Sequence, residues 1–410
     1  MSIVNTDDLR EDMVLSDDVR DISGRLLLQK GQKIILNHIN IMKKWGVTEV
    51  RVVDNSLVKQ IPGPHTDQKD TEQIEQEIKP LFKYADLDHP AIMELFRLAV
   101  LFRSEHDNSE KKAQSIPDKT VACDADHPIE DVQKKIAQKE LKLPEIPSIV
   151  YELNDILSDP LSTADNLAQV VAKSPSLTAA LLRIVNSSFY GFSAKIDTIS
   201  RAVTIIGTRE ISSLALVICT LTIFKNIPKE ILDMHSFLRH SFSCGLISRM
   251  LAANRNIPQT EQMFVAGLLH DIGRVIIYQY FPEQAKALLS RCISSEKIMH
   301  QEENTYLGCK HTDISRYLLQ AWNFPPILED NIFYHHDPVA ANEPVQAAIV
   351  HLADILVNGL GIGSSGERFV PPLDNEAWEC LGLPPSSFEV IIRQAKHQLS
   401  ALELFCNSTK

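Results

Sequence analysis

The sequence predicts a mainly α-helical protein in which a small β-rich module precedes a large helical domain. Apolar residues recur at helical spacing from about residue 136 onward, and neither alternating apolar strands nor a βαβ rhythm occurs there. Short apolar runs separated by turn residues confine the predicted strands to residues 1–54. At 410 residues, 44% of them hydrophobic and 23% charged, the chain is long enough for two or three globular domains.

Residues 1–54 form the first predicted unit. Two short apolar runs flank turn residues at Asp21–Gly24, a stretch of helical spacing reaches Gly46, and Val50–Val53 closes the unit as a strand. Nothing in this unit carries chemistry, so it is interpreted as a docking or dimerisation module.

Residues 55–130 are predicted to be a linker that contains two short helices. Prolines at Ile61–Pro64 open it, and the stretch Ser104–Glu130 is polar enough to be a flexible connector. Between them, apolar residues recur at helical spacing in two segments: Ile74, Ile78, Leu81 and Phe82, then Ile92, Leu95, Phe96, Ala99 and Phe102.

Residues 131–358 are predicted to form the helical domain. Ser162 or Thr163 can cap one helix, and Ser174 before Pro175 opens the next. The longest apolar stretch, Ile211–Phe224, is too short to span a bilayer and predicts a buried helix. Residues 359–410 begin with a Gly/Ser loop and end in a helix that packs on this domain, with dimerisation as the alternative role.

The candidate site centres on His270-Asp271, a histidine and an aspartate inside an apolar, helix-like run. Burying both without partners would cost several kcal/mol, and metal ions are strong partners for such side chains. Eight of the 14 histidines fall between residues 235 and 351. The additional candidate ligands are His240, His311, His335, His336 and Asp354.

Each candidate also has a structural alternative. The dyad can be a hydrogen-bonded core pair, His240 an end cap of the helix that follows it, and His335-His336 a surface doublet. His351 lies one turn before Asp354 and can be its structural partner. His311 leads a helix with Ile314 and Leu318 on its own face, which points it inward. His235 and His300 show no pattern that singles them out.

The net charge, the cysteine spacing and the amino terminus bear on binding partners, redox state and localisation. A net charge of −12 without a basic cluster argues against nucleic-acid binding. Seven scattered cysteines without CxxC spacing indicate reduced thiols, and the six beyond Cys123 are expected in the core. The amino terminus lacks the features of a signal peptide, so we expect a cytoplasmic protein without membrane association.

Several motifs resemble the HDOD domain, an HD-related output domain of bacterial signalling proteins. The resemblance rests on the following segments and covers about half of the chain: Leu143–Pro147, Ser174–Gly191, Ile199–Gly207, His240–Ala252, Phe264–Arg274 and His311–Pro325. One departure is Ser174, which stands where the family usually has an acidic residue. The first unit resembles the β-rich modules that often precede HD-type signalling domains, including HD-GYP domains.

The order of the candidate ligands is similar to that of the HD superfamily of metal-dependent phosphohydrolases. This resemblance implies one or two divalent transition-metal ions (Mn, Fe, Zn or Ni), with His240, His270, Asp271 and Asp354 as ligands of one ion. His311, His335 and His336 would hold a second ion or contact phosphate. Asp271 would bridge the ions and serve catalysis, and Arg274, where relatives carry lysine, would grip phosphate.

Two functions follow from these resemblances. The first is a bacterial signal-transduction protein whose HDOD domain, with a retained metal site, binds protein partners or a phosphorylated small molecule without turnover; a homodimer is compatible with it. The alternative is a metal-dependent phosphohydrolase that uses the ligand series. Hydrolysis of a cyclic dinucleotide meets an objection, because Asp337–Pro344 replaces the Gly-Tyr-Pro loop of HD-GYP proteins.

Overall fold

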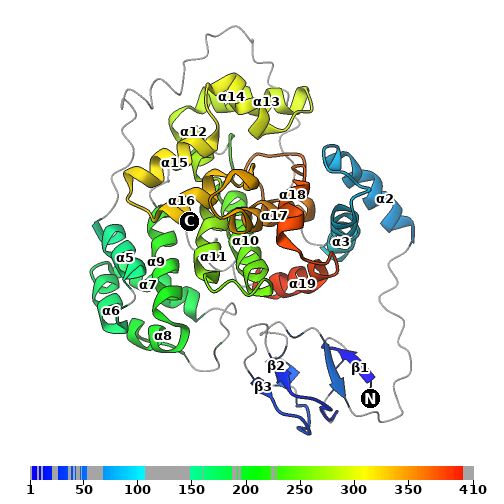
Figure 1. The fold of residues 1–410 in the computed structure, drawn as a ribbon, viewed down its shortest axis with the longest axis vertical. Helices are drawn as coiled ribbons and strands as arrows, with labels where there is room; N and C mark the ends of the chain where they lie inside the picture. The colour runs from blue at the N-terminus through cyan, green and yellow to red at the C-terminus, as the bar shows by residue number, and fades with distance from the viewer. Residues whose placement is uncertain are drawn as a thin grey trace.

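The computed structural model confirms a mainly α-helical chain with a β-rich first unit (Figure 1). The structure describes residues 2–6, 9–10, 13–20, 26–35, 38–39, 42, 47, 49–52, 68–106, 148–159, 161–186, 192, 195–222, 227–228 and 230–399. The predicted linker opening at residues 61–64, most of the polar stretch 104–130, and the prolines at 143–147 lie outside the described residues.

Short antiparallel strands build the first unit. β1 (Ser2–Asn5) pairs with β4 (Glu49–Val52), and β2 (Val19–Arg20) pairs with β3 (Leu26–Leu28). The strands are too short to be stable as isolated hairpins, and a small apolar core joins them. That core, which is separate from the core of the helices, contains Leu9, Leu15, Val19, Leu28, Ile34, Ile39, Met42, Val50 and Val52.

The helices make up most of the rest of the described chain (Figure 1). In chain order they are α2 (Gln68–Ile78), η1 (Lys79–Phe82), α3 (Pro90–His106), α5 (Ser148–Ser158), α6 (Ala164–Ala172), α7 (Pro175–Val185), α8 (Ile199–Ile206), α9 (Thr208–Thr222), α10 (Met234–Asn254), α11 (Thr260–Leu269), α12 (Ile272–Tyr280), α13 (Pro282–Ser294), α14 (Met299–Leu307), α15 (His311–Ala321), α16 (Pro326–Phe333), η2 (Pro338–Ala340), α17 (Pro344–Leu360), α18 (Asn375–Leu381) and α19 (Ser387–Leu399).

Helices α2 and α3 are the two amphipathic segments expected in the linker, and they pack into the main helical core. Their apolar faces belong to the same hydrophobic cluster as α17 and α19. Two polar links reinforce the contact: the Val370 amide donates to the Leu81 carbonyl at 2.8 Å, and Arg97 pairs with Glu389 at 3.0 Å. The predicted domain limits at residues 54, 130 and 358 stay predictions.

Helices α6 and α7 begin at the side-chain caps that the sequence predicts. Thr163 accepts a hydrogen bond from the Asn166 amide, and Ser174 accepts one from the Leu177 amide with Pro175 in the first turn. Both caps satisfy amides that a helix leaves free at its start. The apolar stretch from Ile211 lies in α9, which packs against α5, α7 and α11.

The centre of the fold is formed by α10, α11 and α17, which lie side by side in Figure 1 and pack on one another. All three are buried on most of their surface, as their lack of a polar face predicts. Gly359 lies inside α17 and is not part of the Gly/Ser loop, which begins after Leu360. No helix within the described ranges is long and apolar enough to cross a membrane.

The expectation for the cysteines is partly wrong. Cys219, Cys244, Cys292 and Cys309 are buried free thiols, but Cys380 is exposed on α18. In that short helix Ala377 and Leu381 are buried, whereas Glu379 and Cys380 face solvent, which the local pattern did not reveal. Cys123 and Cys406 lie outside the described residues.

Candidate metal centre

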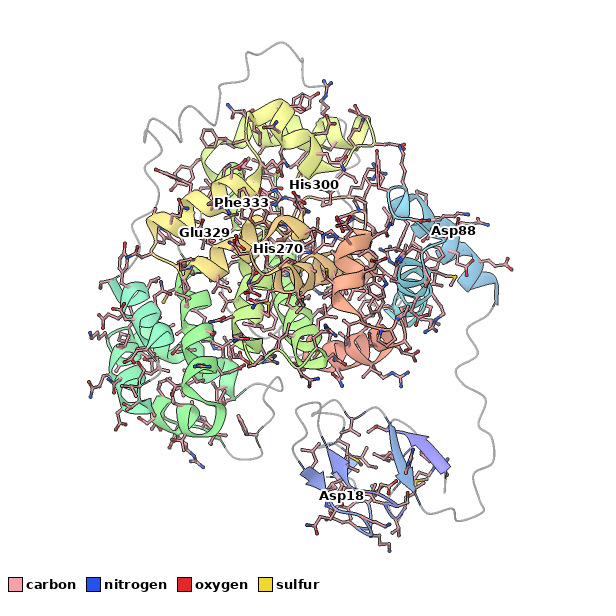
Figure 2. All side chains as sticks on the ribbon, in the orientation of Figure 1. Asp18, Asp88, His270, His300, Glu329 and Phe333 are labelled. Atoms are coloured by element: carbon pink, nitrogen blue, oxygen red, sulfur yellow. The ribbon has the colours of Figure 1, made fainter. Side chains whose placement is uncertain are left out.

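Five separate elements bring the predicted ligands to one place in the core. His240 lies inside α10, so the interpretation of this residue as an end cap is wrong. His311 is the first residue of α15, His335 and His336 follow α16, and Asp354 lies in α17. Figure 2 labels His270 at the middle of this region.

The His270-Asp271 dyad marks a junction between two helices. The expected continuous helix-like run is interrupted there, because α11 ends at Leu269 and α12 begins at Ile272. A helix end can direct adjacent side chains toward the same point, which residues one apart inside a helix cannot do. The break therefore allows both members of the dyad to face the centre.

Gly273 brings α12 close to α15. A Cβ atom at this position would collide with the carbonyl oxygen of His311 and lie 2.8 Å from the Ser315 hydroxyl oxygen. The Gly273 amide donates to that hydroxyl at 2.9 Å. A glycine two residues after Asp271 thus lets His311 approach the dyad.

Four donor atoms form the first group. The Nε2 atoms of His240 and His270 are 3.4 Å apart, and Asp354 Oδ1 lies 3.3 Å from the first and 3.4 Å from the second. Asp271 Oδ2 lies 3.3 Å from His270 Nε2 and 3.9 Å from His240 Nε2. Adjacent ligands of an ion with bonds of about 2.1 Å lie roughly 3.0–3.4 Å apart, so this spacing fits a shared transition-metal ion.

The second group lies on the other side of Asp271. His311, His335 and His336 each offer a ring nitrogen, and these atoms lie within 4.8 Å of one another. Asp271 Oδ1 is 3.1 Å from His311 Nε2, whereas its other oxygen faces the first group. One carboxylate therefore faces both groups, as a ligand shared by two ions would.

Hydrogen bonds at Nδ1 orient three of the rings. The Nδ1 atoms of His270 and His335 each lie 2.7 Å from the carbonyl oxygen three residues earlier, of Gly267 and Ile332 respectively. His311 Nδ1 lies 2.6 Å from Glu303 Oε2. A proton on each Nδ1 leaves Nε2 as a lone-pair donor toward the centre.

Several donor atoms have no hydrogen-bond partner in the described structure. They are buried and include the Nε2 atoms of His335 and His336, while the Nε2 atom of His311 and the Oδ1 atom of Asp271 face only each other, at 3.1 Å. An unsatisfied buried polar atom costs about 1–3 kcal/mol, and the four atoms lie around one point. Divalent ions would satisfy them together, so the residues present fit the implied metal.

Charge in the centre also calls for cations. Three buried acidic residues, Asp271, Glu303 and Glu367, lie 3.2–3.9 Å from Arg274, which is the one buried lysine or arginine among the described residues, and Asp354 is a further buried acid of the centre. Burial disfavours the charged form of Asp271, but Arg274 and His270 hold the pKa of its carboxyl well below the usual range. Burial also lowers the pKa of His270, yet Asp271 and Asp354 raise it to about 10. In the metal-free protein a proton on His270 thus supplies positive charge.

His335 and His336 are neutral in this environment. Burial is the main cause that holds the pKa of both rings well below the usual range, and His270 adds to the effect on His335. A histidine must be neutral to donate a lone pair to a metal. Their protonation state therefore suits ligation.

Arg274 faces the carboxylates around the centre. Its guanidinium lies 3.2 Å from Asp271 Oδ2 and 3.3 Å from Glu303 Oε1, and it donates to the Ser365 hydroxyl at 2.7 Å. The side chain is 3% exposed. The predicted phosphate contact stays a prediction, and the contacts described here orient Asp271.

His351 does not pair with Asp354. Its Nδ1 lies 2.8 Å from the His335 carbonyl, and its Nε2 accepts the Asp374 amide at 3.1 Å. Asp354 Oδ1 instead accepts a hydrogen bond from the Asn358 side chain at 2.7 Å. His351 thus supports the chain at His335.

Sequence reasoning missed three residues of this region. Glu303 binds the ring of His311, Cys244 Sγ lies 3.6 Å from His240 Nε2, and His300 stacks on His336. Cys244 follows His240 by one helical turn, a spacing that could have been noticed. Glu303 and His300 stand in a polar stretch whose burial the local pattern does not show.

The comparisons with known proteins agree with this architecture. Residues 143–338 match the HDOD domain family. This chain carries an HDOD domain. An uncharacterised protein of Treponema pallidum (strain Nichols) is 24% identical over 212 residues, which are 51% of this chain and 40% of that protein. The chain thus matches less than half the length of this relative.

Three crystal structures share the fold of the HDOD chain. An HDOD domain protein of unknown function from Geobacter sulfurreducens is 24% identical, with a TM-score of 0.53 over 67% of this chain and 95% of its own. A Shewanella amazonensis SB2B protein provisionally named a phosphohydrolase is 22% identical, with a TM-score of 0.52 over 67% and 98%. A Marinobacter aquaeolei VT8 protein provisionally named a signal transduction protein is 21% identical, with a TM-score of 0.56 over 66% and 61%.

Proposed function

We propose that this HDOD protein is a signalling protein whose helical domain holds a two-metal centre that binds and hydrolyses a phosphoester. The observation that carries the proposal is the position of Asp271, one oxygen of which faces the group of His270 and Asp354 while the other faces His311 in the second, all-histidine group. The names of two structural neighbours, one a phosphohydrolase and one a signal transduction protein, are compatible with it.

The first ion would be held by His240, His270, Asp271 and Asp354, and the second by Asp271, His311, His335 and His336. Nitrogen and oxygen donors together suit Mn, Fe, Zn or Ni. When bound, such ions supply Lewis acidity toward a phosphoryl oxygen and lower the pKa of a water ligand.

The protein's own residues would prepare the centre for that chemistry. Asp271 stays ionised because Arg274 and His270 stabilise its charge, so it can bind two cations at once. Glu303 fixes the ring of His311 and also accepts the His311 amide at 2.8 Å. The apolar surroundings formed by α10, α11 and α17 exclude bulk water, which strengthens every charge interaction inside.

A specific observation favours a second candidate, a binding module without turnover. His240, His270, His311 and His335 are 0% exposed, and the segment of residues 361–370 runs beside the centre. Two hydrogen bonds anchor this segment. The Ser364 amide donates to the Ser236 carbonyl at 3.2 Å, and the Tyr278 hydroxyl donates to the Ser365 carbonyl at 2.6 Å. Among the candidate ligands, His336 is the one that is partly exposed, so a phosphoester would have little access to the ions.

Partners and location follow as parts of the same proposal. We propose that the protein acts in the cytoplasm with protein partners of a signalling pathway, and that its small-molecule ligand is phosphorylated. The net charge of −12 disfavours nucleic acid.

The experiment measures metal content and hydrolysis together. The purified protein is incubated with Mn(II) or Zn(II), desalted, analysed for bound metal, and assayed with bis(p-nitrophenyl) phosphate. The control is a His270→Ala/Asp271→Ala double variant with an unchanged circular dichroism spectrum. Bound metal and turnover that are both lost in the variant support the proposal. Bound metal without turnover of phosphoesters supports the binding module, and a protein that takes up no metal contradicts both.

A further inference from the structure

His300 lies at the outer edge of the second donor group. It is in the first turn of α14, and its ring stacks on that of His336 with centroids 4.0 Å apart and planes 11° apart. His336 is one of the three histidines whose ring nitrogens could hold a second ion. Figure 2 labels His300, which lies in α14, and His270, which lies at the junction of α11 and α12.

Exposure distinguishes this edge from the rest of the centre. The donors of the first group are at most 5% exposed, as are His311 and His335, whereas His336 and His300 are both partly exposed. Among the candidate ligands His336 is thus the one nearest to solvent, and His300 is its partly exposed neighbour.

The ring of His300 has an unused polar atom. Its Nδ1 is buried and has no hydrogen-bond partner among the described residues, and the ring belongs to none of the groups of donors that could share an ion. Such an atom lacks a structural explanation, since an unsatisfied buried nitrogen costs about 1–3 kcal/mol. A bound ligand could satisfy it.

The charge of the loaded centre indicates what kind of ligand this is. Two divalent ions would outweigh the charges of Asp271 and Asp354, while Arg274 is already balanced by Glu303 and Glu367. The loaded centre would thus carry excess positive charge, which favours an anion. An anion that lies on the second ion beside His336 would place an oxygen next to the ring of His300.

We propose that His300 binds the phosphoryl group of the ligand by donating a ring N–H to a non-bridging oxygen beside the second metal position. This inference rests on the proposed function, because it assumes the loaded centre. It assigns His300 to ligand recognition, separate from the residues that hold the ions.

Two substitutions distinguish phosphate binding by His300 from the packing of its ring on His336. His300→Phe keeps a flat ring on His336 but has no N–H, whereas His300→Gln keeps an N–H and loses the ring. Gln301→Ala, an exposed neighbour on the same turn, is the control. Each protein is loaded with Mn(II), its metal content is measured, and inorganic phosphate is titrated by calorimetry.

The expected result is that His300→Phe keeps the metal content of the wild type and binds phosphate about 10–100-fold more weakly, as loss of a hydrogen bond to a charged group predicts. His300→Gln should recover part of the affinity, and Gln301→Ala should match the wild type. Wild-type affinity in His300→Phe, or loss of metal in that variant, overturns the role of His300 while the centre itself stands. A metal-loaded wild type that does not bind phosphate overturns the proposed function and this inference with it.

Discussion

Glu303 and His311 form the closest side-chain contact around the centre. One carboxylate oxygen of Glu303 lies 2.6 Å from His311 Nδ1 and accepts the His311 amide at 2.8 Å, and both residues are fully buried. Glu303 stands eight residues before His311, in a different helix. A carboxylate that binds the far nitrogen of a metal-ligating histidine fixes the ring and raises its basicity.

The first prediction follows from this contact. Glu303→Ala should weaken metal binding about 10–100-fold, since His311 loses its orientation and Arg274 loses an acidic partner. Glu303→Gln keeps one oxygen acceptor and should fall between this variant and the wild type. Competition with a chromogenic chelator measures the affinity. Glu302→Ala, on the same turn, should bind metal as the wild type does, and equal affinities in all four proteins would contradict the role of Glu303.

The fold class and the candidate dyad could be predicted because their signals are local, whereas the other candidate ligands were assigned by resemblance to the HD superfamily. Helical spacing, caps such as Ser174, and an ionisable dyad among apolar residues are all visible in a short stretch of sequence. The packing of α3 on α17 and of α2 on α3 could not be predicted, because polar residues at both ends of the segment made it resemble a linker.

The immediate partners of the ligands were also beyond sequence reasoning. Glu303 and His351 are ordinary residues of a polar segment and an apolar helix, and only the tertiary fold brings them to His311 and to the His335 carbonyl. The helical spacing that favours His351 beside Asp354 concerns one helix alone, whereas the ring of His351 turns toward a different element. Pairings across elements require the three-dimensional arrangement.

His351 provides the second prediction. Its ring connects the His335 carbonyl to the Asp374 amide, so His351→Ala leaves two backbone groups without partners. The free energy of unfolding should fall by about 2–3 kcal/mol, which chemical denaturation of the metal-free protein measures. Metal content at saturating Mn(II) should stay at the wild-type level because His351 is not a ligand. Unchanged stability with lost metal would instead make His351 part of the centre.

The third prediction concerns pH and lies away from the metal centre. Glu261, in the first turn of α11, is partly buried, and this burial together with nearby Glu210 raises the pKa of its carboxyl well above the usual range. When folding raises the pKa of a carboxyl, its protonated form contributes to the stability of the fold. This contribution is complete at pH values below the unfolded pKa of about 4.3, and it is lost as the pH rises through the folded pKa.

In the Glu261→Gln variant the side chain is neutral at every pH, so the loss of stability on ionisation does not occur. The variant should have a higher unfolding temperature than the wild type at pH 8, and the difference should shrink toward pH 4. Glu283→Gln, an exchange on an exposed side chain of α13, should follow the wild type at both pH values. If Glu261→Gln is less stable than the wild type at pH 8, the charged form of Glu261 is the one that the fold favours.

The last prediction tests how the segment of residues 361–370 is tied to the centre. Gly363 has a left-handed φ of +68°, and a Cβ atom there would collide with the Ser236 carbonyl and lie 2.5 Å from the His240 amide nitrogen. Gly382 is a matched control, because its φ is +54° but the atom nearest to an added Cβ would be 3.6 Å away, on Arg255. Gly382→Ala should therefore lower the free energy of unfolding by only about 1 kcal/mol, the cost of a left-handed backbone for alanine. Gly363→Ala should lose more than that and bind metal more weakly, because α10 must shift at His240 to make room. Equal stability losses in the two variants, with metal affinity unchanged in both, would show that the segment is not tightly packed on α10.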